Sequence, residues 1–278
     1  MKRYRAVPSV EAADPAVLSG GHLWIQEKVA GTQLRFTLEE SGAFRFGDRD
    51  RTFEPGEEPL SLEPAVRHVR RSFDRVAFEQ ALDDPTGVVF FTEATHRGEV
   101  PYDLDRLPPV VGFDVYAESN GGYLPVDAVE SIFDRLGLEP INALDRELRA
   151  VDFRPDTYEF PRSSWYDGPV AGVVVRNKRG GRFQLRNGDV PDEESETADA
   201  EPIARTPEQV AESLCSADLL DRIIAEADST AFDRIFERAI DRIVRTHYGT
   251  LFDTGRGIEA DAFRSAIAAI VQKHLNQR

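Results

Sequence analysis

The stretch IQEKVAGTQLRF, residues 25–36, joins two strand-like runs through a short turn that carries one lysine and one glycine. Apolar and polar residues alternate on both sides of the turn, which predicts two β-strands. Gly31 lets the backbone approach a ligand closely because glycine has no Cβ. A lysine held beside phosphate groups can attack an α-phosphorus and form a phosphoramidate, so Lys28 is a candidate nucleophile.

The same K-x-x-G spacing occurs a second time, at Lys178–Gly181. This second copy lies at the expected tip of a hairpin, where glycines are needed for the backbone alone. By itself, the spacing also fits a surface lysine whose aliphatic stem packs along the protein. The choice between a nucleophile and a surface lysine at position 28 therefore depends on the rest of the chain.

Residues 1 to about 190 are predicted to form mainly strands, with a few helices. Alternation across Ser41 and Gly42 predicts a hairpin, and two apolar runs predict central strands. An amphipathic run with proline at its start and glycine near its end predicts a helix. The polar, turn-rich segment 96–108 is expected to be a loop over the surface. The predicted segments are strands at 22–29, 33–40, 43–49, 87–94 and 108–118, a helix at 125–138 and a hairpin at 170–187.

The segment DVPDEESETADAEP, residues 189–202, holds seven acidic residues and no basic one. Such a run is typical of a solvated linker. Beyond it the apolar residues repeat at helical spacing in three groups, and Thr206 followed by Pro207 is a typical helix start. We therefore expect a first domain at 1–190, an acidic linker at 191–205 and a helical domain at 206–278.

The composition is acidic and poor in lysine. Fifty acidic residues stand against 34 basic ones, a net charge of −16, and only four of the bases are lysine. This balance favours a halophilic protein in a salt-rich cytoplasm, although it also fits an ordinary acidic soluble protein. No apolar run is long enough to span a membrane, and the start of the chain lacks the apolar core of a signal peptide. A cytoplasmic location is expected, and the lone Cys215 fits it.

Five stretches occur in the order and approximate spacing of the covalent nucleotidyltransferases. They are EKVAGTQLRF, FGDRDR, VVFFTEATHRGEVPYDLDRLPP, VGFDVY and GVVVRN. Together, over roughly residues 20–190, they resemble the RNA ligase family, the ATP-dependent RNA-sealing branch of that superfamily. The acidic composition adds a resemblance to a haloarchaeal-type member.

The resemblance implies an α+β fold, with a mixed, largely antiparallel nucleotidyltransferase (ATP-grasp-like) domain followed by a small all-helical domain. It implies ATP and Mg²⁺ as cofactors, RNA ends as partner, and no membrane. The implied reaction joins an RNA 5′-phosphate to a 3′-hydroxyl through a lysyl-AMP intermediate. DNA ligases and capping enzymes usually continue into a barrel of short strands, which the helical pattern after residue 205 contradicts.

The resemblance also implies roles for single residues. Lys28 would accept AMP, and Gly31 would shape the loop around it. Either Arg49 or Arg51 would hold phosphate or the ribose edge, for which a planar guanidinium is well suited. Without the neighbouring motifs, these two arginines would fit the solvated end of a hairpin.

Three more positions receive roles in the same way. Glu93 would contact the ribose hydroxyls or help to hold the metal, and Phe113 would stack on adenine. Arg186 would supply positive charge near the phosphates. Glu93 also fits a simple strand-end acid, and Phe113 also fits core packing.

Two departures from the family pattern place the activity in question. Ala171 stands where the fourth motif usually has a metal-binding acid, and Gln184 stands where the fifth motif usually has a lysine. A lost cationic contact to the triphosphate often costs a few kcal/mol of barrier. The alternative function is therefore a weakened or inactive module of the same fold that binds nucleotide or RNA ends. An enzyme that transfers AMP to another substrate is a third possibility.

Overall fold

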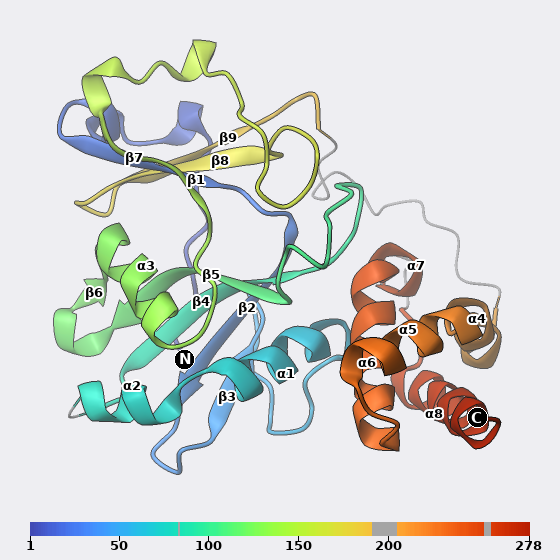
Figure 1. The fold of residues 1–278 in the computed structure, drawn as a ribbon. Coiled ribbons are helices and arrows are strands. Elements are labelled where there is room, and N and C mark those ends of the chain that lie inside the picture. Colours follow the sequence, from blue (N-terminus) through green and yellow to red (C-terminus); the bar gives the residue numbers. More distant parts are fainter. Residues whose placement is uncertain (83, 191–204, 253–256) are drawn as a thin grey trace.

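The computed structural model describes residues 1–82, 84–190, 205–252 and 257–278. In these residues two β-sheets stand one above the other, and a group of helices packs beside the lower sheet (Figure 1). Neighbouring strands within each described sheet run antiparallel. The predicted α+β fold with largely antiparallel sheets is confirmed. Most of the expected acidic linker lies outside the described residues.

The four-stranded sheet has the order β7-β1-β8-β9. Its inner strands carry leucine, tryptophan and isoleucine in β1 and three consecutive valines in β8, residues that suit a buried pleated surface. One face packs on segments with short 3₁₀ turns, which precede β1 and follow β7 in the sequence. This cluster includes Ile25, Val173 and Phe183. The strands are β1 (His22–Glu27), β7 (Ala143–Arg149), β8 (Gly172–Asn177) and β9 (Arg182–Arg186), and the turns are η1 (Val10–Ala12), η2 (Pro15–Leu18), η5 (Ala150–Asp152) and η6 (Pro155–Thr157).

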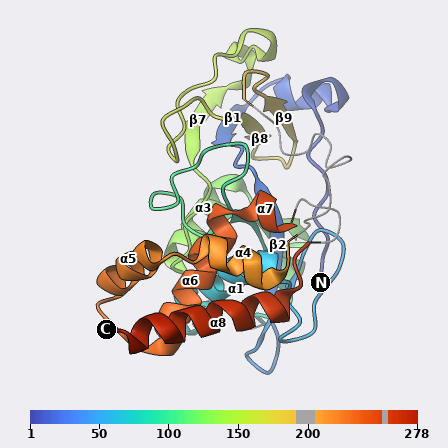
Figure 2. The same cartoon turned by 90° about the vertical axis from the view of Figure 1, so that its right-hand side faces the viewer.

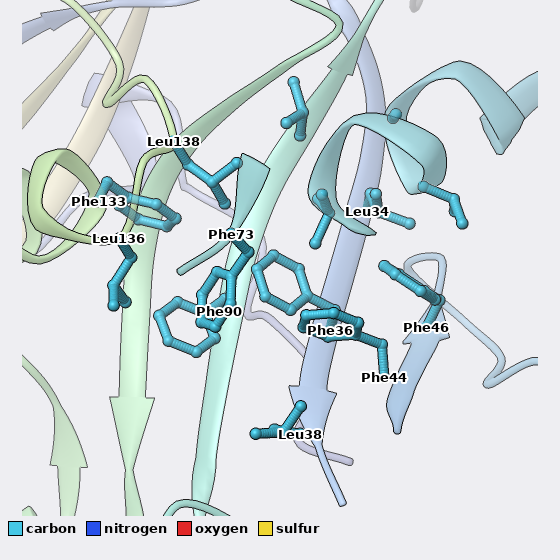
Figure 3. Packing of buried hydrophobic residues seen from close by; sticks show 14 of the residues in the cluster. Leu34, Phe36, Leu38, Phe44, Phe46, Phe73, Phe90, Phe133, Leu136 and Leu138 are labelled. Atoms are coloured by element: carbon cyan, nitrogen blue, oxygen red, sulfur yellow. The ribbon is translucent and has the colours of Figure 1, made fainter. Parts of the chain in front are cut away.

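The five-stranded sheet has the order β3-β2-β4-β5-β6 and carries the predicted hairpin. Helices cover one of its faces over an aromatic core (Figure 3), in which the rings of Phe36 and Phe90 stack with centroids 4.9 Å apart. Gly112 has no room for a side chain there, because a Cβ would lie 2.3 Å from the ring of Phe133. The elements are β2 (Gly31–Leu38), β3 (Phe44–Gly47), β4 (Val88–Thr95), β5 (Val110–Ala117), β6 (Gly122–Tyr123), η3 (Leu60–Leu62), α1 (Glu63–Ser72), α2 (Arg75–Ala81), η4 (Glu118–Asn120) and α3 (Val126–Arg135).

The C-terminal part is helical, as predicted, and it lies in front of α1 in Figure 2. Thr206 and Gln209 form a capping box and Pro207 takes the first helical position. The apolar run 210–224 is split into two helices because Ser216 caps a new one. No helix in the described ranges is long and apolar enough to cross a membrane. The helices are α4 (Pro207–Leu214), α5 (Ala217–Ala227), α6 (Phe232–Thr246), α7 (Tyr248–Phe252) and α8 (Ala260–Asn276).

The segment 96–108 differs from its prediction as a surface loop. It has no regular helix or strand, but its apolar residues are buried in a cluster with the turn after β1. Tyr102 is 1% exposed, and Val100 and Leu107 are fully buried. The polar residues between them obscure this pattern in the sequence. The segment therefore braces the turn that carries Lys28.

The helical part is fixed to the five-stranded sheet through the ends of β2 and β4. The rings of His96 and Tyr248 stack with centroids 3.5 Å apart, and the Tyr248 hydroxyl lies 2.9 Å from the Thr32 hydroxyl. The buried guanidinium of Arg245 donates hydrogen bonds to the carbonyls of Thr95 and Leu107. These contacts join α6 and α7 to the strands that begin at Gly31 and end at Thr95.

His96 makes this contact sensitive to acid. Burial, and then the charge of Arg245, lower the pKa of His96 to about 3 from an ordinary value of 6.5. The unfolded chain therefore takes up a proton before the folded chain does, and the free energy of unfolding falls as the pH drops below 6.5. We expect His96→Gln to lose less stability than the parent between about pH 7 and about pH 5. Urea unfolding at both pH values measures this, and equal losses in both proteins would contradict it.

Candidate active site

A cavity of about 290 Å³ lies between the two sheets. Its walls come from β1 and β8 on one side, from β2, β4 and β5 on the other, and from residues near the N-terminal end. Five of the seven residues that received a role from the sequence line this cavity: Lys28, Gly31, Arg49, Glu93 and Phe113. Segments that are far apart in the sequence therefore meet at one place.

Lys28 directly follows β1, and its position is fixed by the backbone on both sides. Its N–H donates a hydrogen bond to the carbonyl of Gly172 at 2.9 Å. Two residues later, the N–H of Ala30 donates to the buried hydroxyl of Tyr102 at 2.9 Å. Lys28 makes no ion pair with any described residue, whereas Lys178 lies 2.7 Å from Glu147 at the hairpin tip. The two K-x-x-G copies are thus distinguished by their surroundings.

Gly31 takes the first position of β2, directly beside β4. Its register partner is Thr95, and a Cβ at Gly31 would lie 2.5 Å from the carbonyl oxygen of Ala94. Real Cβ contacts are not this short, so a side chain here would push β2 away from β4. The glycine is required by this close strand contact and not by a left-handed turn.

The two arginines of the GDRDR stretch have different surroundings. Arg49 lines the cavity. Arg51 lies outside the lining, with its guanidinium 3.2 Å from Asp48 and over the ring of Phe53. Of the two alternatives, the structure brings Arg49 to the pocket.

Glu27 is a cavity residue that the sequence interpretation missed. It is 1% exposed, and its carboxylate accepts hydrogen bonds from the Asn142 amide at 3.1 Å and from the hydroxyl of Ser163. The backbone N–H of Ser164 adds a third at 3.3 Å. Burial raises its pKa, and the hydrogen bonds partly offset that effect. A buried acid directly before a candidate nucleophile is a sequence signal that could have been used.

Phe113 lies next to a buried ionic cluster around Asp114, which the sequence interpretation also missed. Asp114 is fully buried and accepts hydrogen bonds from Arg176 at 3.0 Å and from Arg182 at 2.9 Å. It also accepts one from the hydroxyl of Tyr4 at 2.9 Å, and the Tyr4 ring stands edge-on to Phe113 with centroids 5.0 Å apart. Burial, and then the charge of Asp114, raise the pKa of Tyr4. The cluster fixes the position of Phe113 at the cavity wall.

The comparison with protein families agrees with this arrangement. The sequence model of a family described as RNA ligase matches residues 21–189, more than half of the chain. The chain belongs to the RNA ligase family. No curated protein sequence matches it.

A solved RNA ligase shares the fold of this family member. An RNA ligase of Naegleria gruberi with ATP and Mn has a TM-score of 0.53 at 12% identity, and the match covers 68% of this chain and 57% of that one. The same ligase with PPi gives 0.53 at 14% identity, over 68% and 56% of the two chains. An archaeal ATP-dependent RNA ligase gives 0.49 at 13% identity, over 99% of this chain and 65% of that one. The chain thus spans less than two thirds of these ligases, and the likeness concerns the fold alone.

The structure shows the surroundings of Ala171 and Gln184, the two positions that depart from the RNA ligase pattern. Ala171 packs against the apolar cluster around Tyr102 and does not line the cavity. Gln184 lines the cavity, and its side-chain amide donates a hydrogen bond to the carbonyl of Val7 at 3.0 Å. Arg186 is exposed at the end of β9 and lies outside the lining. The fourth- and fifth-motif positions therefore give the cavity no acid and no lysine.

Proposed function

We propose that this chain is an ATP-dependent RNA ligase that joins an RNA 5′-phosphate to a 3′-hydroxyl through AMP bound to Lys28. The observation that carries the proposal is the cavity in which Lys28, Arg49, Glu93 and Phe113 meet. Membership of the RNA ligase family and the likeness to a ligase solved with ATP and Mn support it. The cavity combines an amine, a guanidinium, a carboxylate and an aromatic ring, which suit the parts of ATP.

In the first step the Nζ of Lys28 attacks the α-phosphorus of ATP. An N–P bond forms, the P–O bond to pyrophosphate breaks, and the amine gives up its proton. Phe113 stacks on adenine, while the guanidinium of Arg49 holds phosphate. The AMP then passes to the RNA 5′-phosphate, and the 3′-hydroxyl of the other end displaces it.

The residues present fit a divalent cation. Mg²⁺ is usually held by one or two carboxylates together with substrate phosphates and water. Glu93 offers a carboxylate at the cavity. The carboxylate of Glu27, which also lines the cavity, accepts hydrogen bonds from Asn142, Ser163 and Ser164. In the described part of the chain there is no group of three side chains that could hold a metal by themselves. Glu93 would thus hold a cation that arrives with ATP and neutralises charge on its phosphates.

A second candidate function is supported by the fifth-motif position. The amide of Gln184 is bound to Val7 and carries no positive charge to assist the departure of pyrophosphate. A chain with this cavity could bind nucleotide or RNA ends without turnover.

An RNA-sealing assay tests the proposal and separates the two functions. The full chain is incubated with ATP, Mg²⁺, high potassium chloride and a 5′-phosphorylated RNA, either single-stranded or nicked in a duplex. Sealed RNA and released AMP support the ligase. Nucleotide binding without sealing and without AMP on the protein would overturn it in favour of the binding module.

A further inference from the structure

Basic side chains are concentrated in two segments that each supply one residue to the cavity wall, although the chain as a whole is acidic. Two segments contribute them: residues 2–5 with Lys2, Arg3 and Arg5, and residues 49–51 with Arg49 and Arg51. All five residues are exposed. In a chain with a net charge of −16, this concentration of positive charge needs a physical reason.

The segment 2–5 is held against the cavity by its tyrosine. Tyr4 lines the cavity, and its hydroxyl is bound to Asp114 at 2.9 Å. Its two neighbours, Arg3 and Arg5, are exposed, as alternation along an extended chain requires. The ring of Tyr4 contacts the rings of Phe91 and Phe113, so the N-terminal segment lies against β4 and β5 of the five-stranded sheet. The segment thus presents two guanidiniums outward from an anchored backbone.

Arg35 connects the two basic segments from below. It is 1% exposed, and its guanidinium donates to the carbonyl of Lys2 at 2.8 Å and to the carbonyl of Arg51 at 3.4 Å. Its Nε has no hydrogen-bond partner among the described residues. No described carboxylate forms an ion pair with it, so a further positive charge lies beneath the exposed ones. Burial, and then the charge of Arg3, lower its pKa.

The acids nearby neutralise only part of this surface. Asp48 forms an ion pair with Arg51 at 3.2 Å, and Asp50 lies in the same loop. Within the described residues, Arg3, Arg5 and Arg49 make no ion pair. Arg49 belongs both to the cavity and to the basic surface, so the surface leads directly to the candidate nucleophile.

We propose that Lys2, Arg3, Arg5, Arg49 and Arg51 form the surface on which the phosphodiester backbone of the RNA lies as its end enters the cavity. This inference rests on the proposed function. Guanidiniums pair well with phosphates, and neutralising a nucleic-acid backbone releases counterions. RNA would thus meet an acidic protein at a place where the local charge is positive.

The test compares RNA binding by Arg3→Ala/Arg5→Ala with that of the parent chain over a range of potassium chloride concentrations. The probe is a short fluorescent 5′-phosphorylated single-stranded RNA, followed by anisotropy. The double variant is expected to bind at least about tenfold more weakly at low salt. The slope of log affinity against log salt is expected to become shallower by about 1.4, about 0.7 for each lost phosphate contact.

Two further variants control for charge and folding. Arg149→Ala/Arg179→Ala removes two exposed arginines away from the cavity and is expected to bind like the parent. Arg3→Lys/Arg5→Lys keeps the charge and is expected to keep the salt slope. If Arg3→Ala/Arg5→Ala matches the parent in affinity and slope, or if the parent binds no RNA at any salt concentration, the inference is overturned.

A separate readout distinguishes this inference from the proposed function. Transfer of AMP from ATP to the protein needs no RNA and is measured on the same variants. Weaker RNA binding without AMP transfer in any protein would support the surface and contradict the ligase. AMP transfer with unchanged RNA binding would support the ligase chemistry and contradict the surface.

Discussion

Replacing Lys28 by arginine is expected to lower the rate of AMP transfer from ATP to the protein by at least about three orders of magnitude. Arginine keeps the positive charge at the cavity, but its guanidinium stays protonated and is a poor nucleophile. Nucleotide binding should therefore persist while the covalent step is lost. Intact-protein mass spectrometry after incubation with ATP and Mg²⁺ measures the adduct directly.

The chain offers a matched control for this experiment. Lys178→Arg changes the lysine of the second K-x-x-G copy, which is exposed and paired with Asp127 and Glu147 at the hairpin tip. It should form the AMP adduct as the parent does. An adduct that survives in Lys28→Arg, or one that disappears in Lys178→Arg alone, would show that Lys28 is not the acceptor.

Local sequence patterns predicted those strands and helices that are determined by residues close together in the sequence. The hairpin around Gly42 follows from strict alternation, and α4 begins where Thr206 and Pro207 provide a cap and a first position. The order of the motifs predicted that Lys28, Glu93 and Phe113 come together, which the cavity shows. In each of these cases, neighbours in the sequence or a familiar motif carried the information.

Contacts over long sequence distances could not be predicted in this way. Tyr4 binds Asp114, and Arg245 binds Thr95, more than a hundred residues away in each case. Nothing near Tyr4 in the sequence indicates that its side chain lines the cavity. Polar residues that bind distant partners show no period, and only the tertiary structure reveals those partners.

Loss of the Arg245 guanidinium should cost considerable stability, because it makes buried hydrogen bonds that link α6 to the end of β4 and to residue 107. Its guanidinium is buried and donates to the Thr95 carbonyl at 3.1 Å, the Thr95 hydroxyl at 2.9 Å and the Leu107 carbonyl at 2.6 Å. In addition, its own carbonyl accepts the N–H of Arg97 at 2.7 Å. Burial lowers its pKa to about 10, so the group remains charged at neutral pH.

We expect Arg245→Met to lower the free energy of unfolding by about 2–4 kcal/mol. Methionine fills a similar length but donates no hydrogen bond, so two buried carbonyls lose their partners. Arg234→Met is the matched control, because Arg234 is exposed on the same helix and its change should have little effect. The urea midpoint of each variant measures the difference in stability.

Because Thr95 pairs with Gly31 across β2 and β4, Arg245→Met should also transfer AMP to Lys28 more slowly. Equal midpoints for the two variants would show that α6 does not hold these strands.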